Sequence, residues 1–161
     1  MVFIALDQSS KVSGYSIFKD NELIKYGHIS SAASAPIEQR LLKLTCLLDE
    51  LLKEYNFDKL IFEDIQEQGG NVKTFKVLAQ VQGAILLWCI NNKMDYEIIP
   101  PSVWRKGIKD TYGVNFGKLR AEQKAASINF IKNYFQIEAT EDESDAICIG
   151  ASILVKKVSA W

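Results

Sequence analysis

The sequence predicts an α/β domain with a mixed five-stranded sheet and helices on both faces. Short apolar segments of strand length alternate with longer segments whose apolar residues recur every three or four positions, which is the pattern of strands and amphipathic helices. The first three strands follow one another directly, whereas the later strands are separated by helices. That order favours antiparallel pairing followed by right-handed parallel crossovers. No linker, low-complexity run or repeat interrupts the chain, so residues 1–161 are expected to form one domain.

The first part of the chain is expected to hold four strands and one helix. Residues 2–6 are wholly apolar, as in a strand that is buried on both faces. Asp20-Asn21-Glu22 is a hairpin-type connection between the next two strands. Ser34 and Pro36 are expected to open the helix, because Ser caps helices and Pro is tolerated in the first turn. The predicted strands are 2–6, 14–19, 23–29 and 60–62, and the helix ends at Tyr55.

The second part is expected to be mainly helical. Pro100-Pro101 stops the last strand, since proline cannot donate to a sheet. The segment from Gly69-Gly70 to Lys76 has two interpretations, a mobile loop at a substrate or the start of the next helix. The expected elements are a helix at 71–92, a strand at 96–99, a short turn at 102–107, and helices at 118–134 and 142–158.

Composition excludes several classes of protein. The longest apolar run, residues 83–90, is too short to cross a membrane. The first residues are apolar with no basic lead, which is unlike a secretory signal. Cys46, Cys89 and Cys148 have neither disulfide nor zinc-site spacing, so we expect three buried thiols. The expected compartment is the cytoplasm, or the host cytoplasm for a phage-encoded chain.

Charge is unevenly distributed although the formal net charge is only −1. Residues 100–132 contain seven basic and two acidic side chains, and residues 133–145 contain five acids and no base. One interpretation is a solvated basic helix followed by an acidic loop. The other is a metal-dependent enzyme that acts on a polyanion.

A single histidine limits the available chemistry. His28 is the only one, so catalytic systems that need several histidines are excluded, and a structural role is expected for it. With no further imidazole and no paired thiolates, a catalytic metal must be held by oxygen. Oxygen ligands favour Mg²⁺ or Mn²⁺.

Four carboxylates occupy positions where they can converge. Asp7 and Glu63 each follow an apolar strand, and ligand sites of α/β sheets form at the carboxyl ends of strands. Asp142 and Asp145 are three residues apart at the start of the last helix and so share a face. Each also has a simpler explanation. Asp7 can start a turn, Glu63 can be exposed beside Asp64, and residues 140–143 fit a helix capping box.

At these residues the chain resembles the RuvC family of Holliday-junction resolvases, in the ribonuclease-H-like superfamily, and its bacteriophage branch in particular. The resemblance runs from Phe3 to Ile153. It rests on four motifs in the family's order: Ile4-Ala5-Leu6-Asp7 with Ser10 and Gly14-Tyr15, Ile61-Phe62-Glu63, Leu78 to Gly83, and Asp142-Glu143-Ser144-Asp145-Ala146. Two departures are Gln8-Ser9, where the family commonly has Pro-Gly, and Asp64-Ile65-Gln66, where cellular members carry an aromatic wedge. The missing wedge favours broad action on branched DNA.

The resemblance implies a structure-selective endonuclease that nicks four-way and other branched DNA in pairs, leaving 5′-phosphate and 3′-hydroxyl ends. Asp7, Glu63, Asp142 and Asp145 would bind two Mg²⁺, with Mn²⁺ as a substitute. The long helix around Gly83 would pack against its twin in a homodimer. The basic residues expected to contact DNA are Lys124, Arg120, Lys118, Lys73, Lys76 and Arg105. The alternatives are a nuclease of the same superfamily that acts on RNA or RNA–DNA hybrids, and a non-enzymatic or nucleotide-binding relative.

Overall fold

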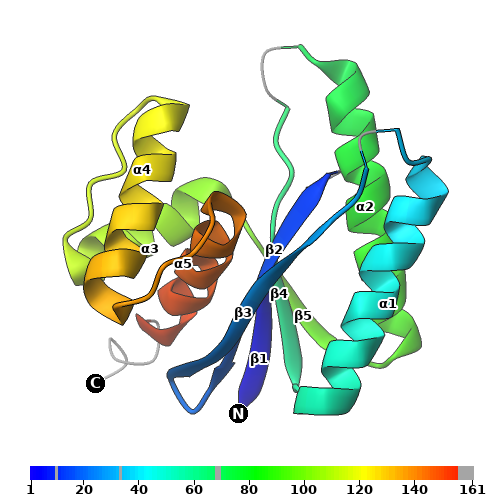
Figure 1. The fold of residues 1–161 in the computed structure, drawn as a ribbon, viewed down its shortest axis with the longest axis horizontal. Coiled ribbons are helices and arrows are strands. Elements are labelled where there is room, and N and C mark those ends of the chain that lie inside the picture. Colours follow the sequence, from blue (N-terminus) through cyan, green and yellow to red (C-terminus); the bar gives the residue numbers. More distant parts are fainter. Residues whose placement is uncertain (10, 33, 68–69, 156–161) are drawn as a thin grey trace.

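A single sheet of five strands forms the centre of the molecule in this computed structural model (Figure 1). The structure describes residues 1–9, 11–32, 34–67 and 70–155. The strand order is β3-β2-β1-β4-β5. The strands are β1 (Val2–Asp7), β2 (Val12–Lys19), β3 (Glu22–Ser30), β4 (Lys59–Glu63) and β5 (Asp95–Ile99).

The sheet combines an antiparallel meander with parallel crossovers, as predicted. β2 is antiparallel to both β1 and β3, whereas β4 is parallel to β1 and β5. In the register, Leu6 lies opposite Phe62 and Asp7 lies opposite Gly14. Because β1 and β4 run in the same direction, Asp7 and Glu63 reach the same edge of the sheet.

Helices cover both faces of the sheet. α1 (Ile37–Tyr55) and α2 (Val72–Asn91) lie to the right of it in Figure 1. α3 (Pro101–Tyr112), α4 (Arg120–Phe130) and α5 (Glu141–Val155) lie to the left. Alternate residues of β1 enter the two cores, Ile4 and Leu6 on the α1–α2 side and Phe3 and Ala5 on the α5 side. This is why residues 2–6 are apolar without interruption.

α5 packs unusually close to the sheet. A Cβ atom on Gly14 of β2 would lie 2.0 Å from the carbonyl oxygen of Asp142, and one on Gly150 would lie 2.3 Å from the ring of Phe18. The buried hydroxyl of Ser16 donates to the carbonyl of Ala146 at 2.8 Å. These contacts fix the position of α5 against β2.

Several predicted boundaries are wrong. The segment 102–107 is not a short turn but part of α3, which Pro101 opens and Gly113 ends in the left-handed conformation. The segment 118–134 divides into α4 and a π-helix, η1 (Ile131–Phe135). Ser34 does not cap α1, because that helix begins after Pro36 without a side-chain cap. The final helix is described to Val155, and residues 156–158 of the prediction lie outside the described residues.

The structure also tests the expected burial of the cysteines and the expected start of α2. Cys89 and Cys148 are buried, but Cys46 is exposed, since it faces away from the sheet on α1. Val72–Lys76 forms the first turn of α2, which favours the helix-start interpretation, whereas Gly69 and Ser10 lie outside the described residues. Within the described chain, no helix has the length and apolarity needed to cross a membrane.

Candidate active site

The four predicted acids line one cavity of about 620 Å³ at the carboxyl ends of β1 and β4. Asp7 ends β1, Glu63 ends β4, and Asp142 and Asp145 come from the first turns of α5. The fold therefore brings the four acids to one cavity. Two carboxylates about 5 Å apart repel by roughly 3 kcal/mol at an effective dielectric of about 20. A cluster of four ionised carboxylates is therefore stable only if positive charge lies nearby.

Asp7 is the electrostatic centre of the cluster. Burial raises the pKa of its carboxyl well above the ordinary value, and the charges of Glu63, Asp145 and Asp142 raise it further. Lys124 opposes this shift. Asp7 is thus surrounded by the other three acids, which favour its protonated form unless a cation is present.

Glu63 is held by a tryptophan. The indole Nε1 of Trp104, a residue of α3, donates to Oε1 of Glu63 at 2.9 Å. Burial raises the pKa of Glu63, while the hydrogen bond from Trp104 and the charge of Arg105 partly oppose the shift. Because Trp104 is almost wholly buried, its N–H needs a partner inside the protein, and Glu63 supplies it.

Asp145 has a comparable partner on α4. The hydroxyl of Ser127, which is itself buried, donates to Oδ1 of Asp145. Burial raises the pKa of Asp145, and the bond from Ser127 and the charges of Arg105 and Lys124 work against that rise. Two of the four acids are therefore oriented by neutral donors on neighbouring helices.

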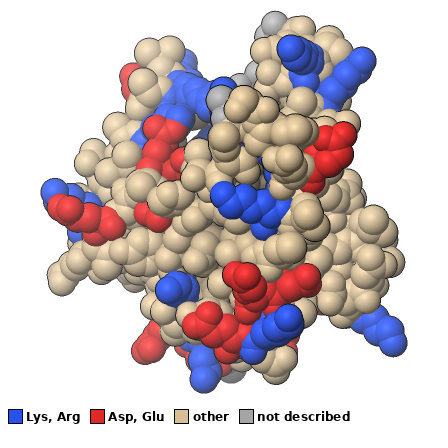
Figure 2. Space-filling view, turned by 45° about the vertical axis from the view of Figure 1, so that its right-hand side comes forward, with Lys and Arg blue, Asp and Glu red and all other residues tan. Residues whose placement is uncertain are grey.

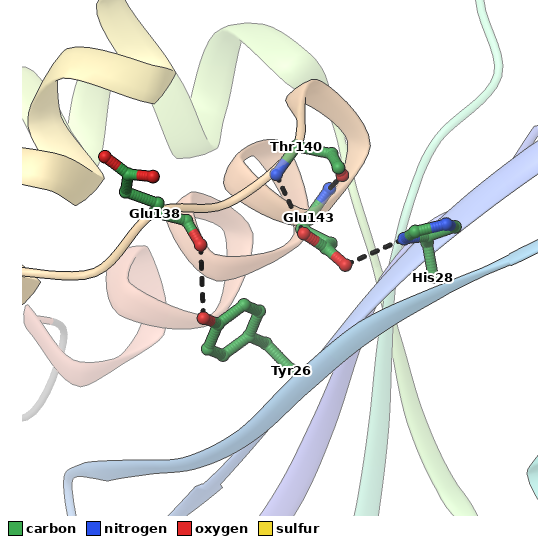
Figure 3. A network of polar contacts seen from close by, with 5 residues as sticks. All are labelled: Tyr26, His28, Glu138, Thr140 and Glu143. Atoms are coloured by element: carbon green, nitrogen blue, oxygen red, sulfur yellow. Dashed lines mark hydrogen bonds and ion pairs between the residues drawn. The ribbon is translucent and has the colours of Figure 1, made fainter.

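A polar network fixes the start of α5 (Figure 3). The amide of Thr140 donates to Oε2 of Glu143 at 2.8 Å, and the amide of Glu143 donates to the Thr140 hydroxyl at 3.4 Å, which is the predicted capping box. Nδ1 of His28 lies 2.7 Å from Oε1 of Glu143. Burial tends to raise the pKa of Glu143, but the bonds from Thr140 and His28 outweigh it and lower that pKa. His28 thus has the structural role that was expected.

The network includes a second link to β3. The hydroxyl of Tyr26 donates to the carbonyl of Glu138 at 3.2 Å (Figure 3). Tyr26 thus attaches the segment before α5 to the edge strand, and His28 attaches the first turn of α5 to the same strand. The acids of α5 consequently approach the cavity from a helix that is fixed at its first turn.

Basic side chains surround part of the cavity. Arg105, Lys118, Arg120 and Lys124 line it, whereas Lys73 and Lys76 are exposed on the first turns of α2 and do not. Lys124 forms an ion pair with Glu141, and the guanidinium of Arg105 lies 4.7 Å from the ring centre of Trp104. In Figure 2, basic and acidic side chains lie next to one another at the upper left of the face shown.

Three residues around the acids were not predicted from the sequence. Besides Trp104 and Ser127, Gln8 lines the cavity, and its Nε2 donates to the main-chain carbonyl of Glu63, joining the ends of β1 and β4. Of the three, only Gln8 stood out in the sequence, because Gln8-Ser9 replaces the Pro-Gly that is common in the RuvC family. Nothing in the sequence indicates the hydrogen bonds of Trp104 or Ser127, because each joins elements that are far apart along the chain, α3 to the end of β4 and α4 to α5.

The donor set suits a hard divalent cation. All four candidate ligands are carboxylates, as Mg²⁺ and Mn²⁺ prefer. In the part of the chain that the structure describes, no three His, Cys, Asp or Glu side chains are arranged so that they could hold a metal ion. Binding therefore requires the carboxylates to turn toward one another. The raised pKa values of Asp7, Glu63 and Asp145 show why a cation would favour that movement.

Comparisons with known proteins identify the family of the chain. A family model described as crossover junction endodeoxyribonuclease RuvC matches residues 3–152. The protein of that name from Alkaliphilus metalliredigens is 27% identical over 154 residues, covering 92% of this chain and 90% of the relative. The one from Dictyoglomus thermophilum is 24% identical and covers 98% of both chains.

Solved structures share the fold. T. thermophilus RuvC in complex with a Holliday junction substrate has a TM-score of 0.78, at 11% identity, over 99% of this chain and 97% of that one. The fowlpox virus resolvase with Holliday junction DNA has a TM-score of 0.61, at 17% identity, over 99% of both chains. With almost its whole length matched by the family model, the chain belongs to the RuvC family of crossover junction endodeoxyribonucleases.

Proposed function

We propose that this chain is a metal-dependent, structure-selective endonuclease that resolves Holliday junctions and other branched DNA by paired nicks, leaving 5′-phosphate and 3′-hydroxyl ends. The observation that carries the proposal is the convergence of Asp7, Glu63, Asp142 and Asp145 on one cavity that is also lined by basic residues. Acids that bind a cation and bases that bind phosphate are the two requirements for phosphodiester hydrolysis. The proposal places the whole activity in one domain, residues 1–161, acting in the cytoplasm.

The four acids would hold two Mg²⁺, or Mn²⁺ in its place. Asp7 would be the central ligand, because the charges of the other three acids all act on its carboxyl. The ions would supply an activated water and would stabilise the leaving 3′ oxygen. Trp104 and Ser127 would keep the Glu63 and Asp145 carboxylates in the orientation that the ions need.

Arg105, Lys118, Arg120 and Lys124 would hold DNA phosphates near the acids. Lys124 would exchange its ion pair with Glu141 for one with phosphate. Lys73 and Lys76, which lie outside the cavity, would contact a more distant part of the junction. No aromatic follows Glu63 directly, which supports selection by DNA shape rather than by sequence.

The proposed enzyme acts as a homodimer that packs through α2. Val72, Gly83, Leu87 and Ile90 form an exposed stripe along that helix, and no atom lies within 4 Å of the position of a Cβ on Gly83. A flat apolar stripe with a glycine permits close packing against a two-fold copy, which would present two cavities to two strands. Replacing Leu87 with Lys should convert a dimer to a monomer in analytical ultracentrifugation, and an unchanged sedimentation coefficient would argue against α2 as the interface.

Cleavage of a substrate panel tests the activity. The wild-type chain with Mg²⁺ should cut a four-way junction symmetrically and should cut a linear duplex or an RNA–DNA hybrid far more slowly. Asp7→Asn should still bind the junction but lose more than about 100-fold in cleavage rate, because losing even an outer partner of a ligand costs about 10- to 100-fold. Faster cutting of the hybrid than of the junction would refute the proposed substrate, and unchanged cleavage by Asp7→Asn would refute the metal site.

A further inference from the structure

We propose that a second basic surface, beside the cavity of the four acids, receives a backbone phosphate of a DNA arm that leaves the branch point. This inference rests on the proposed function and extends its substrate site to residues that no other argument above uses. The surface is a notch between the β1–β2 connection, the end of β3 and the first half of α1. Its basic residues are Lys11, Arg40 and Lys43.

The lining of the notch has the chemistry of a phosphate contact. Three cationic side chains lie around it together with the serines at positions 9, 13 and 31, and no Asp or Glu is among its lining residues. Its remaining lining residues are Ile29, Leu44 and Val81. Cations and hydroxyls without a competing carboxylate are the groups that contact DNA phosphates.

Hydrogen bonds join Ser9 to Ser13 and the carbonyl of Lys11 to Ser31. The amide of Ser9 donates to Oγ of Ser13 at 3.0 Å, and the Ser13 hydroxyl donates to the carbonyl of Ser9 at 3.1 Å. The amide of Ser31 donates to the carbonyl of Lys11 at 2.8 Å. The main chain of Lys11 is therefore fixed to β2 and to the end of β3, so its position needs no ordering when DNA binds.

The other two cations are also directed to this region. Nζ of Lys43 donates to the carbonyl of Ser30, and Nε of Arg40 donates to the carbonyl of Ala35 at 2.9 Å. Among the described residues, no ion pair involves Lys11 or Lys43. Their charges are thus not neutralised by an acid of the same chain.

The notch is small and adjoins the cavity of the acids. Its volume is about 10 Å³, which is about the space of one water-sized oxygen. One oxygen of a backbone phosphate fits that space. Ser9 lines both the notch and the cavity of the acids. This position favours a phosphate of a strand that leaves the cavity as the occupant of the notch.

Salt dependence of junction binding tests the proposal. The double variant Lys11→Ala/Lys43→Ala should lower the slope of log K against log salt by about 0.9, because the notch neutralises one phosphate and each neutralised phosphate contributes about 0.9. The matched control is Lys25→Ala/Lys53→Ala, two exposed lysines whose loss changes the net charge equally. Lys53 lies ten residues beyond Lys43 on α1, or about 15 Å away. Binding is measured with a four-way junction in EDTA, so that no cleavage occurs.

Methylphosphonate linkages then identify the contact. A single neutral linkage is placed in turn at each position of one arm. At one or two positions outside the branch point it should weaken binding of the wild type. At those positions it should not change binding of the Lys11/Lys43 double variant. Equal slopes for the double variant and its control, or no position with this dependence, would overturn the surface. Cleavage by the wild type in Mg²⁺ decides the proposed function separately, and a wild type that binds no junction overturns both.

Discussion

Replacing Gly14 with Ala should displace α5 and disable the site without changing any acid. The new Cβ would lie 2.0 Å from the Asp142 carbonyl oxygen, 2.4 Å from its carbon and 2.9 Å from the Glu143 nitrogen. Real Cβ atoms essentially never approach within 3.0 Å, so β2 and α5 must separate by about 1 Å. The obstructing atoms are main chain, and a rotamer change cannot relieve the contact.

The expected cost follows from that displacement. Overpacking typically costs about 1–3 kcal/mol, and a contact with the backbone of a helix should reach about 3 kcal/mol. For a chain of this size that loss lowers the melting temperature by about 6–12 °C. Moving Asp142 and Asp145 by about 1 Å should also reduce junction cleavage by about 100-fold.

Gly107→Ala is the matched control. It makes the same substitution in α3, facing the same helix, but its Cβ would meet Ser152 at an ordinary 3.5 Å. Because Ala has the better helix propensity, this variant should be as stable as the wild type or more stable by up to about 1 kcal/mol. Urea unfolding followed by tryptophan fluorescence compares the two. If Gly14→Ala unfolds at the same urea concentration as Gly107→Ala, the close approach of α5 does not constrain the fold.

Three further variants or conditions test the surroundings of the acids. Trp104→Phe keeps the ring but loses the donor to Glu63, so the pKa of Glu63 should rise and half-maximal cleavage should need about 10- to 100-fold more Mg²⁺; an unchanged Mg²⁺ titration would contradict this. Ser127→Ala should likewise raise the pKa of Asp145 and increase the Mg²⁺ concentration needed for cleavage, which the same Mg²⁺ titration measures. In EDTA, the unfolding free energy of the wild type should fall as pH rises above about 4, because burial makes the folded-state pKa of Asp7 higher than the unfolded one. Asp7→Asn should flatten this dependence in urea melts, and an equally steep profile would show that Asp7 ionises normally.

The strands and the acids at their ends were predictable from local patterns. An uninterrupted apolar segment such as residues 2–6 identifies a strand that is buried on both faces, and the first charge after it marks the edge of the sheet. Asp7 and Glu63 each stand at the carboxyl end of a strand, so the parallel pairing of β1 with β4 brings them to the same edge of the sheet. The acids of α5 followed from their spacing in one helical turn.

α3 was not predicted because its signal is weak. Only Trp104 and Ile108 of this helix are fully buried, Val103 is exposed, and Gly107 stands in the middle. The helical spacing of Trp104, Ile108 and Tyr112 extends over little more than two turns, and Pro100-Pro101 suggested an interruption rather than a beginning. Tertiary packing decides the outcome, since the edge-to-face contact of Trp104 with Phe116 at 5.4 Å and the burial of Ile108 outweigh the propensity of one glycine.

The cluster of acids links stability to function in this chain. Repulsion of roughly 3 kcal/mol for each close pair is large against the 5–15 kcal/mol that stabilises a typical domain, so the anchors of α5 must withstand it. Ser16 and the Glu143 network attach that helix at points other than the four acids, and Gly14 lets its main chain approach β2 closely at Asp142. A cation that binds only the folded state adds stability that grows with the logarithm of its concentration relative to its dissociation constant. Asp7→Asn should accordingly be more stable than the wild type in EDTA and lose that advantage in Mg²⁺, because the carboxyl that most disfavours the metal-free fold is the one that the proposed function makes a ligand of the metal.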